Sequence, residues 1–141
     1  MGLTPPEIIR QALAQRVVER VDGTGMIPAA VMILLYRKKG EYCILLNKRS
    51  EEVEHHKGEI SFPGGAQDPE DQDSLATALR ETEEEMGIRR GDVTVIGELD
   101  ETVTRSGFLV NVFIGTIEHP YVFKPSAIEI AEVLEFPVSS F

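Results

Sequence analysis

Apolar residues gather along the chain in short runs rich in β-branched side chains, and polar turns separate these runs. Residues 29–36 and 42–46 form two such runs, and the Lys38-Lys39-Gly40-Glu41 segment between them is typical of a hairpin. Further runs at 93–99 and 108–117 predict two more strands. The pattern therefore predicts a β-sheet that is built partly from hairpins.

Two other segments carry helix signals. Thr4-Pro5-Pro6-Glu7 is typical of a helix start with a capping box, and we expect this helix to run to about Arg20. A second helix is predicted over residues 74–86, ending at Gly87. Residues 128–136 are compatible with either a helix or a strand. This order of elements predicts a mixed α and β fold, with an antiparallel or mixed sheet flanked by helices.

Charge narrows the classes of partner. The chain has 141 residues, which predicts one domain, and its net charge is −10 from 14 basic and 24 acidic residues. Nucleic-acid binding needs a basic footprint, so we expect no nucleic-acid partner. A small phosphate ligand remains compatible with this charge if a metal ion or a local basic pocket receives it.

Membrane and secretory signals are missing from the printed sequence. No apolar stretch approaches the roughly 20 residues of a membrane span, and residues 1–6 have neither the basic start nor the apolar core of a signal peptide. Cys43 is the only cysteine, so no intrachain disulfide can form. We therefore expect a cytoplasmic protein without a membrane partner.

The most unusual local feature is an acidic run near the end of the second predicted helix. Four of the five residues in Glu81-Thr82-Glu83-Glu84-Glu85 are acids. The C-terminus of a helix carries roughly half an elementary negative charge, so carboxylates there are unfavourable, and like-charge neighbours add to the cost. Two explanations are open: a solvated face, or a face whose charge is cancelled by a bound cation.

The helical repeat of about 100° per residue separates these acids. Glu81 and Glu85 lie together beside the small Ala78, at one margin of the stripe that is expected to pack on the sheet. Glu84 is next to Glu81 but closer to solvent, and Glu83 lies on the other side. Converging carboxylates are the ligands that Mg²⁺ or Mn²⁺ favours, so Glu81, Glu85 and Glu84 are the candidate metal ligands. The packing stripe consists of Leu75, Leu79, Thr82 and Met86.

Arg80 and a glycine pair flank this cluster. We expect Arg80 to orient a carboxylate or the preceding loop through a forked hydrogen bond. The alternative is a surface ion pair with Glu84, worth less than about 1 kcal/mol. Gly64 and Gly65 lie in a turn upstream. We expect at least one of them to have a positive φ, or to pass too close to the helix for a Cβ.

These residues together resemble a known family pattern. Residues 80–88 match the second half of the Nudix box, G-x5-E-x7-R-E-U-x-E-E-x-G-U with U apolar, except that Thr82 takes an apolar position. In the first half, Gly65 and Asp71 each lie one residue before the positions that the box assigns to its glycine and its acid. A loop that is one residue longer explains both shifts, and loops tolerate such a change at little cost.

A second resemblance is to the coenzyme A pyrophosphatases within that family. Leu45-Leu46-Asn47-Lys48-Arg49-Ser50, then Gly58 and Phe62-Pro63-Gly64-Gly65, is similar to their signature L-L-T-x-R-S-x3-R-x3-G-x3-F-P-G-G. Thr104-Arg105-Ser106-Gly107-Phe108 is similar to their T-x-S-G-F segment. The resemblance implies substrate contacts from Arg49, Ser50, Gly64 and Gly65.

The signature also has two departures. Asn47 replaces the threonine, and Glu54 replaces the second arginine. Coenzyme A carries a 3′-phosphate that needs a cation in so acidic a chain. Arg49 is the first candidate because of its forked donors, with Lys48 and Lys57 next, whereas Glu54 would oppose the phosphate.

The resemblance implies an α/β (α+β) fold, the Nudix α/β/α sandwich with a mixed sheet between helices, in a single domain over residues 1–141. Proteins of the coenzyme A group generally continue beyond the equivalent of Phe141, so the chain is either truncated or a naturally shorter member. The oligomeric state is open, with a homodimer among the alternatives.

The implied reaction is hydrolysis of a pyrophosphate bond assisted by Mg²⁺ or Mn²⁺, with Arg80, Glu84 and Glu85 as catalytic residues. The general base is Glu84 or a later residue such as Glu132. The expected substrate is coenzyme A or a derivative, giving 3′,5′-ADP and 4′-phosphopantetheine. One alternative is another small nucleotide, namely ADP-ribose, NADH or a nucleoside triphosphate. The other is a non-catalytic Nudix-fold nucleotide-binding module.

Overall fold

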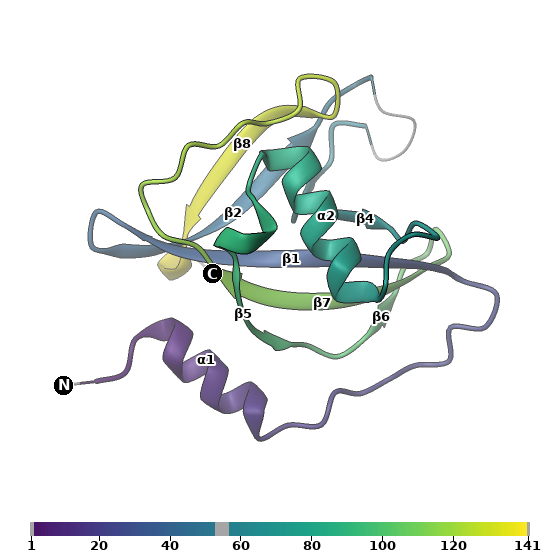
Figure 1. Cartoon of the computed structure of the whole chain (residues 1–141), viewed down its shortest axis with the longest axis horizontal. Coiled ribbons are helices and arrows are strands. Elements are labelled where there is room, and N and C mark those ends of the chain that lie inside the picture. The colour runs from purple at the N-terminus through teal and green to yellow at the C-terminus, as the bar shows by residue number, and fades with distance from the viewer. Residues whose placement is uncertain (1, 53–56, 141) are drawn as a thin grey trace.

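A computed structural model describes residues 2–52 and 57–140 (Figure 1). None of the helices in these ranges is long and apolar enough to cross a membrane. In chain order the elements are α1 (Pro5–Ala14), β1 (Ile27–Lys38), β2 (Glu41–Arg49), β3 (Ile60–Ser61), β4 (Gly64–Ala66), α2 (Ser74–Met86), the 3₁₀ turn η1 (Arg90–Asp92), β5 (Thr94–Glu98), β6 (Thr102–Val103), β7 (Phe108–Thr116), β8 (Ile130–Pro137) and η2 (Val138–Ser140).

The strands of the described residues form one mixed sheet. Its main path is β3-β2-β1-β7-β5, with β4 beside β1, β6 beside β7 and β8 beside β2. β1 and β7 run parallel, and the other pairs are antiparallel. The predicted hairpin is confirmed, since Lys38 pairs with Glu41 across its turn. The ambiguous segment 128–136 is largely strand β8, because its backbone pairs with β2 over most of the length of that strand.

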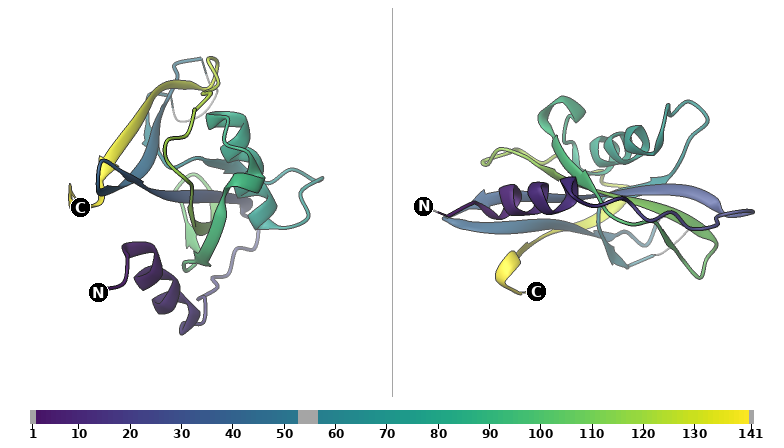
Figure 2. Two further views of the ribbon diagram at one scale, coloured as in Figure 1. Left: turned by 60° about the vertical axis from the view of Figure 1, so that its left-hand side comes forward. Right: turned by 90° about the horizontal axis from the view of Figure 1, so that it is seen from below.

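Alternation along β1 divides the core between the two faces of the sheet. Met32, Leu34 and Tyr36 are buried beneath α2 together with Met86. Leu35, on the opposite face, belongs to a second cluster that includes Ile96 and Ile114 and contacts Ile9 and Leu13 of α1. α2 lies over β1 and β4, whereas α1 lies apart from it near β5 (Figures 1 and 2). The mixed α/β class with helices on both faces is thereby confirmed.

The first helix starts where the sequence predicts but ends earlier. Thr4 and Glu7 form the expected capping box, whereas α1 ends at Ala14 rather than near Arg20. The next residues are held by acids outside the helix: Arg20 Nη1 lies 2.6 Å from Glu98 Oε2. The backbone N–H of Val21 also donates to a side chain, a Glu101 carboxylate oxygen at 3.0 Å, and not to a carbonyl of a continuing helix. Carboxylates near β5 therefore replace the helix carbonyls as partners of this segment.

Candidate active site on helix α2

Local signals fix both ends of α2. The Asp73 carboxylate accepts a hydrogen bond from Ala76 N at 2.8 Å and caps the N-terminus. Gly87 ends the helix in the left-handed region with φ 71°. A glycine is favoured at this position because other residues rarely adopt that conformation. The predicted bounds of residues 74–86 are therefore confirmed.

The predicted packing stripe is also confirmed. Thr82 and Met86 are fully buried, and Leu75 and Leu79 pack against the same core. Thr82 Oγ1 donates to Ala78 O in the preceding turn at 2.7 Å. A buried hydroxyl without a partner would be costly, so this bond explains how threonine occupies an apolar position of the box.

Glu85 is buried at the margin of this stripe, with 1% of its side chain exposed. Its Oε1 accepts from Asn47 Nδ2 at 3.2 Å and from Gly64 N at 3.4 Å. Its Oε2 has no hydrogen-bond partner among the described residues. Arg49 supplies a cation, with Nη1 3.8 Å from that oxygen. A buried carboxylate oxygen without a hydrogen bond is unusual, and a bound ion or a catalytic role would explain it.

Arg80 organises the loop and two of the acids. Its Nε and Nη2 donate to the Asp71 carboxylate at 3.0 Å each, and Nη2 also donates to Ala66 O at 3.1 Å. Its Nη1 donates to Glu81 Oε1 at 2.7 Å and lies 3.2 Å from Glu84 Oε2. This contact with Arg80 holds the pKa of Asp71 well below its usual range. The forked hydrogen bond expected of Arg80 is confirmed, and Asp71 is its partner despite falling one residue early.

Of the two alternatives expected for Gly64 and Gly65, a positive φ or a close approach that leaves no room for a Cβ, the structure confirms the second. Neither Gly64 nor Gly65 is among the described glycines with positive φ. A Cβ on Gly65 would instead overlap the carboxylate of Glu81. A Cβ on Gly64 would overlap the backbone of Ala30 and Val31 in β1. Close approach to the backbone of β1 therefore requires glycine at Gly64, whereas at Gly65 an added Cβ would displace the end of the Glu81 side chain.

Burial opposes charge on the two carboxylates beside these glycines. Burial raises the pKa of Glu81 to about 7, although the Arg80 charge acts in the other direction. Burial raises the pKa of Glu85 to about 8; the charge of Glu81 adds to this shift, and Arg49 opposes it. Carboxylates in this state gain from a nearby cation, which cancels their mutual repulsion.

Judged by their chemistry alone, the side chains of Glu81 and Glu85 offer oxygen donors of the kind that a divalent cation binds. The described part of the chain contains no three His, Cys, Asp or Glu side chains already arranged around a metal position. Glu81 and Glu85 nevertheless fit the group, because they are hard oxygen donors and Glu85 Oε2 lacks a hydrogen bond. Mg²⁺ commonly takes one or two carboxylates and completes its shell with water and phosphate. The assignment of Glu81, Glu84 and Glu85 as ligands stays a prediction.

These raised pKa values predict how stability depends on pH in the metal-free protein. In the folded chain the pKa of each group lies above the usual value of 4.5, so each binds a proton more tightly than it does in the unfolded chain. Stability should therefore fall as the pH rises from about 4.5 to about 8 and then level off. Each pKa unit corresponds to about 1.4 kcal/mol, so the loss should be on the order of a few kcal/mol.

Thermal unfolding in EDTA, measured between pH 5.5 and 8.5, tests this expectation. Glu81→Gln/Glu85→Gln should flatten the pH dependence of Tm, and Mg²⁺ should stabilise the wild-type protein more at pH 8.5 than at pH 5.5. A wild-type Tm that follows the double variant at every pH would contradict the assignment of these two groups.

The structure separates the other candidates into those near the cluster and those away from it. Arg49 lies beside Glu85. Ser50 is buried, and its hydroxyl bonds Ile128 O and Glu52 N, so it ties β2 to the start of β8. Glu84 is half exposed and bonded to Arg80. Its role as general base stays a prediction.

The later candidate base, Glu132, is not brought to the cluster. It pairs with Lys48 across the β2–β8 ladder. Asn47 turns toward Glu85, so alternation along the strand turns Lys48 and Glu132 to the opposite face. The charge of Glu129 does act on Glu85 and raises its pKa, a contribution that the sequence argument missed. Lys57 is exposed, and Glu54 lies outside the described residues.

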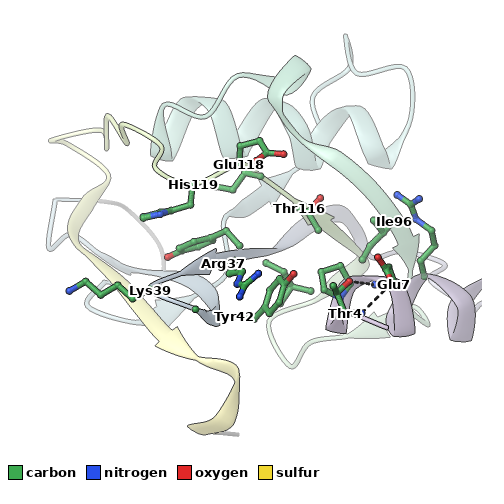
Figure 3. Close-up of a pocket in the computed structure, with 15 residues that line it drawn as sticks. Thr4, Glu7, Arg37, Lys39, Tyr42, Ile96, Thr116, Glu118 and His119 are labelled. Atoms are coloured by element: carbon green, nitrogen blue, oxygen red, sulfur yellow. Dashed lines mark hydrogen bonds between the residues drawn. The ribbon is translucent and has the colours of Figure 1, made fainter. Parts of the chain in front are cut away.

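A cavity of about 750 Å³ lies elsewhere, between the start of α1 and the end of the β1–β2 hairpin (Figure 3). Its lining includes Thr4, Arg37, Tyr42 and His119. Arg37 lies seven positions along β1 from Ala30, which pairs with Gly65. At about 3.3 Å per residue this is a separation of about 23 Å, so the cavity is distinct from the acidic cluster.

Comparison with known sequences agrees with this geometry. The profile of the NUDIX domain matches residues 26–133. The peroxisomal coenzyme A diphosphatase NUDT7 of Mus musculus is 35% identical over 112 residues, covering 79% of this chain and 48% of that protein. An uncharacterized Nudix hydrolase NudL of Photorhabdus laumondii is 36% identical over 110 residues, covering 78% and 59%. The chain thus spans roughly half the length of these curated relatives.

Comparison with solved structures gives the fold. A C. elegans Ap4A hydrolase binary complex aligns with a TM-score of 0.66 at 21% identity, covering 81% of this chain and 82% of that one. The NUDIX domain of Shewanella oneidensis NrtR, complexed with ADP ribose, aligns with a TM-score of 0.61 at 15% identity, covering 98% and 86%. From the profile match, the two relatives and the glutamate-bearing helix α2 held by Arg80, we conclude that the chain belongs to the NUDIX domain family.

Proposed function

We propose that this chain hydrolyses the pyrophosphate bond of a nucleoside diphosphate linked to another group, with the help of Mg²⁺ or Mn²⁺. The observation that carries the proposal is Glu85, a buried carboxylate whose Oε2 lacks a hydrogen bond, next to Glu81 on the same helix. Two carboxylates that burial makes costly to ionise gain most when a cation is present. Family membership supports the same chemistry.

The residues in and around the acidic cluster have different proposed roles in the reaction. Glu81 and Glu85, with Glu84, would hold the cation, which when bound supplies Lewis-acid stabilisation of the charge that develops on the diphosphate. Arg80 fixes Glu81 and ties it to the Asp71 loop. Glu84 is exposed to solvent and would take a proton from the attacking water. Water adds to one phosphorus and the bridging oxygen leaves with the other phosphate.

Coenzyme A or a derivative is the substrate that we propose. The sequence similarity to the mouse coenzyme A diphosphatase supports it, as does the L-L-x-x-R-S pattern at the end of β2 and the residue after it. Arg49 lies at the edge of the acidic cluster, with 20% of its side chain exposed, where an anionic group of the substrate would meet its forked donors. Cleavage of coenzyme A would give 3′,5′-ADP and 4′-phosphopantetheine.

A comparison of coenzyme A with its 3′-dephospho form tests this substrate. The wild-type protein should prefer coenzyme A in kcat/KM, and Arg49→Ala should reduce that preference by about tenfold or more, since a hydrogen bond to a charged group is worth about 1.5–3 kcal/mol. Arg49 also acts on Glu85, so the rates on both substrates should fall. Only the ratio of the two kcat/KM values reports on the 3′-phosphate.

Lys48→Ala is the matched control, because Lys48 is the neighbouring cation on the opposite face of β2. It should leave the ratio unchanged. Equal wild-type rates on both substrates would contradict the coenzyme A assignment. Faster turnover of ADP-ribose, NADH or a nucleoside triphosphate would support the first alternative, and tight binding without hydrolysis would support the non-catalytic module.

The remaining expectations stay predictions. These are the cytoplasmic location and the single domain over residues 1–141; the oligomeric state stays open, with a homodimer among the alternatives. The residues that carry the proposed chemistry lie within the matched range 26–133.

A further inference from the structure

Asn47 connects the centre of the sheet to Glu85. Its side chain is fully buried, and Nδ2 donates to Glu85 Oε1 at 3.2 Å. At the other end, its Oδ1 accepts from Ser61 Oγ at 3.5 Å. Strand pairs on both sides hold the backbone of β2 here, since Asn47 lies opposite Ser61 in β3 and Val133 in β8. The amide group is therefore fixed in front of Glu85.

Chemistry fixes which end of the amide faces the carboxylate. When Glu85 is ionised, as a ligand of a cation must be, its carboxylate only accepts hydrogen bonds, so the NH₂ group then points to Glu85 and the oxygen to Ser61. Gly64 N donates to the same Oε1 at 3.4 Å. Both donors thus act on one oxygen of Glu85, and Oε2 is left without a hydrogen bond.

We propose that Asn47 is a positioning residue for the divalent cation: by holding Glu85 Oε1, it leaves Oε2 as the oxygen that meets the metal. Asn47 acts through Glu85 and does not touch the substrate. The inference rests on the proposed metal-dependent function. It also gives a role to the departure from the coenzyme A signature, because asparagine reaches further than the threonine that it replaces.

Mn²⁺ binding in the absence of substrate tests the inference, with the free ion quantified by electron paramagnetic resonance at pH 8.5. Asn47→Leu keeps much of the side-chain volume but removes the donor, and should weaken Mn²⁺ binding about 10- to 100-fold. Asn47→Thr carries a hydroxyl donor on a shorter side chain, so it should recover only a small part of this loss. If Asn47→Leu does not fold, Asn47→Ala gives the same comparison with Asn47→Thr.

Asn111→Leu is the matched control for the loss of a buried asparagine. Asn111 is also buried in the sheet and donates to a carboxylate, that of Glu101, at 2.8 Å. This variant should lose stability but keep the wild-type Mn²⁺ affinity. Wild-type Mn²⁺ affinity in Asn47→Leu or Asn47→Ala would overturn the inference alone. No Mn²⁺ binding by the wild-type protein would overturn the proposed function itself, and the inference with it.

Discussion

Glu85→Gln and Glu81→Gln should each lower kcat/KM by about 10²-fold or more while the protein stays folded. A neutral amide is a poorer ligand for a hard cation than a carboxylate. A loss of about 3 kcal/mol of transition-state stabilisation corresponds to about 10²-fold in rate. Unfolding of the metal-free variants should occur at or above the wild-type Tm at pH 8.5, because each variant removes a carboxylate that burial makes costly to ionise.

Glu83→Gln is the matched control in the same acidic run. Glu83 is exposed, and its carboxylate accepts from Arg90 N in η1 at 3.3 Å, away from Glu85. A glutamine oxygen can accept the same bond, so activity should stay within about twofold of wild type. Steady-state rates on the preferred substrate and Mg²⁺ titrations decide the comparison. Equal damage from Glu83→Gln and Glu85→Gln would refute the division of the helix into two faces.

Gly65→Ala should abolish most of the activity without unfolding the protein. The added Cβ overlaps the end of the Glu81 side chain, which can move aside because it is flexible. The protein then keeps its fold, but Glu81 leaves the position in which Arg80 holds it. A displacement of about 1 Å at a reacting centre can cost about 10²-fold in rate, and a loss of that size should appear in kcat/KM.

Gly64→Ala should have the opposite signature. Here the added Cβ overlaps Ala30 O and the backbone of Val31, which the sheet holds in place, so the cost is in stability, about 1–3 kcal/mol or more. Gly91→Ala is the control, because a Cβ on Gly91 would meet nothing within 4 Å. Activity and Tm measured together separate the three variants. Full activity in Gly65→Ala would rule out the close approach to Glu81 as the reason for glycine.

The sequence by itself determined the features that depend on neighbouring residues. The bounds of α2 follow from its N-cap and from Gly87, and the faces of the helix follow from the 3.6-residue repeat. The fork of Arg80 was predictable in kind, because a loop acid lies nearly two helical turns and a short loop away. Such signals act between residues a few positions apart, and the chain must satisfy them in any compact fold.

Only the tertiary structure decided which distant groups meet. α1 ends early because Arg20 and Val21 bond to acids about 80 residues away, and no local pattern contains that competition. Segment 128–136 is a strand because β2 offers it backbone partners. Asn47, which the sequence marked only as a departure, meets Glu85 38 residues later. A hydrogen bond between distant residues depends on register and burial, which exist only once the sheet has formed around α2.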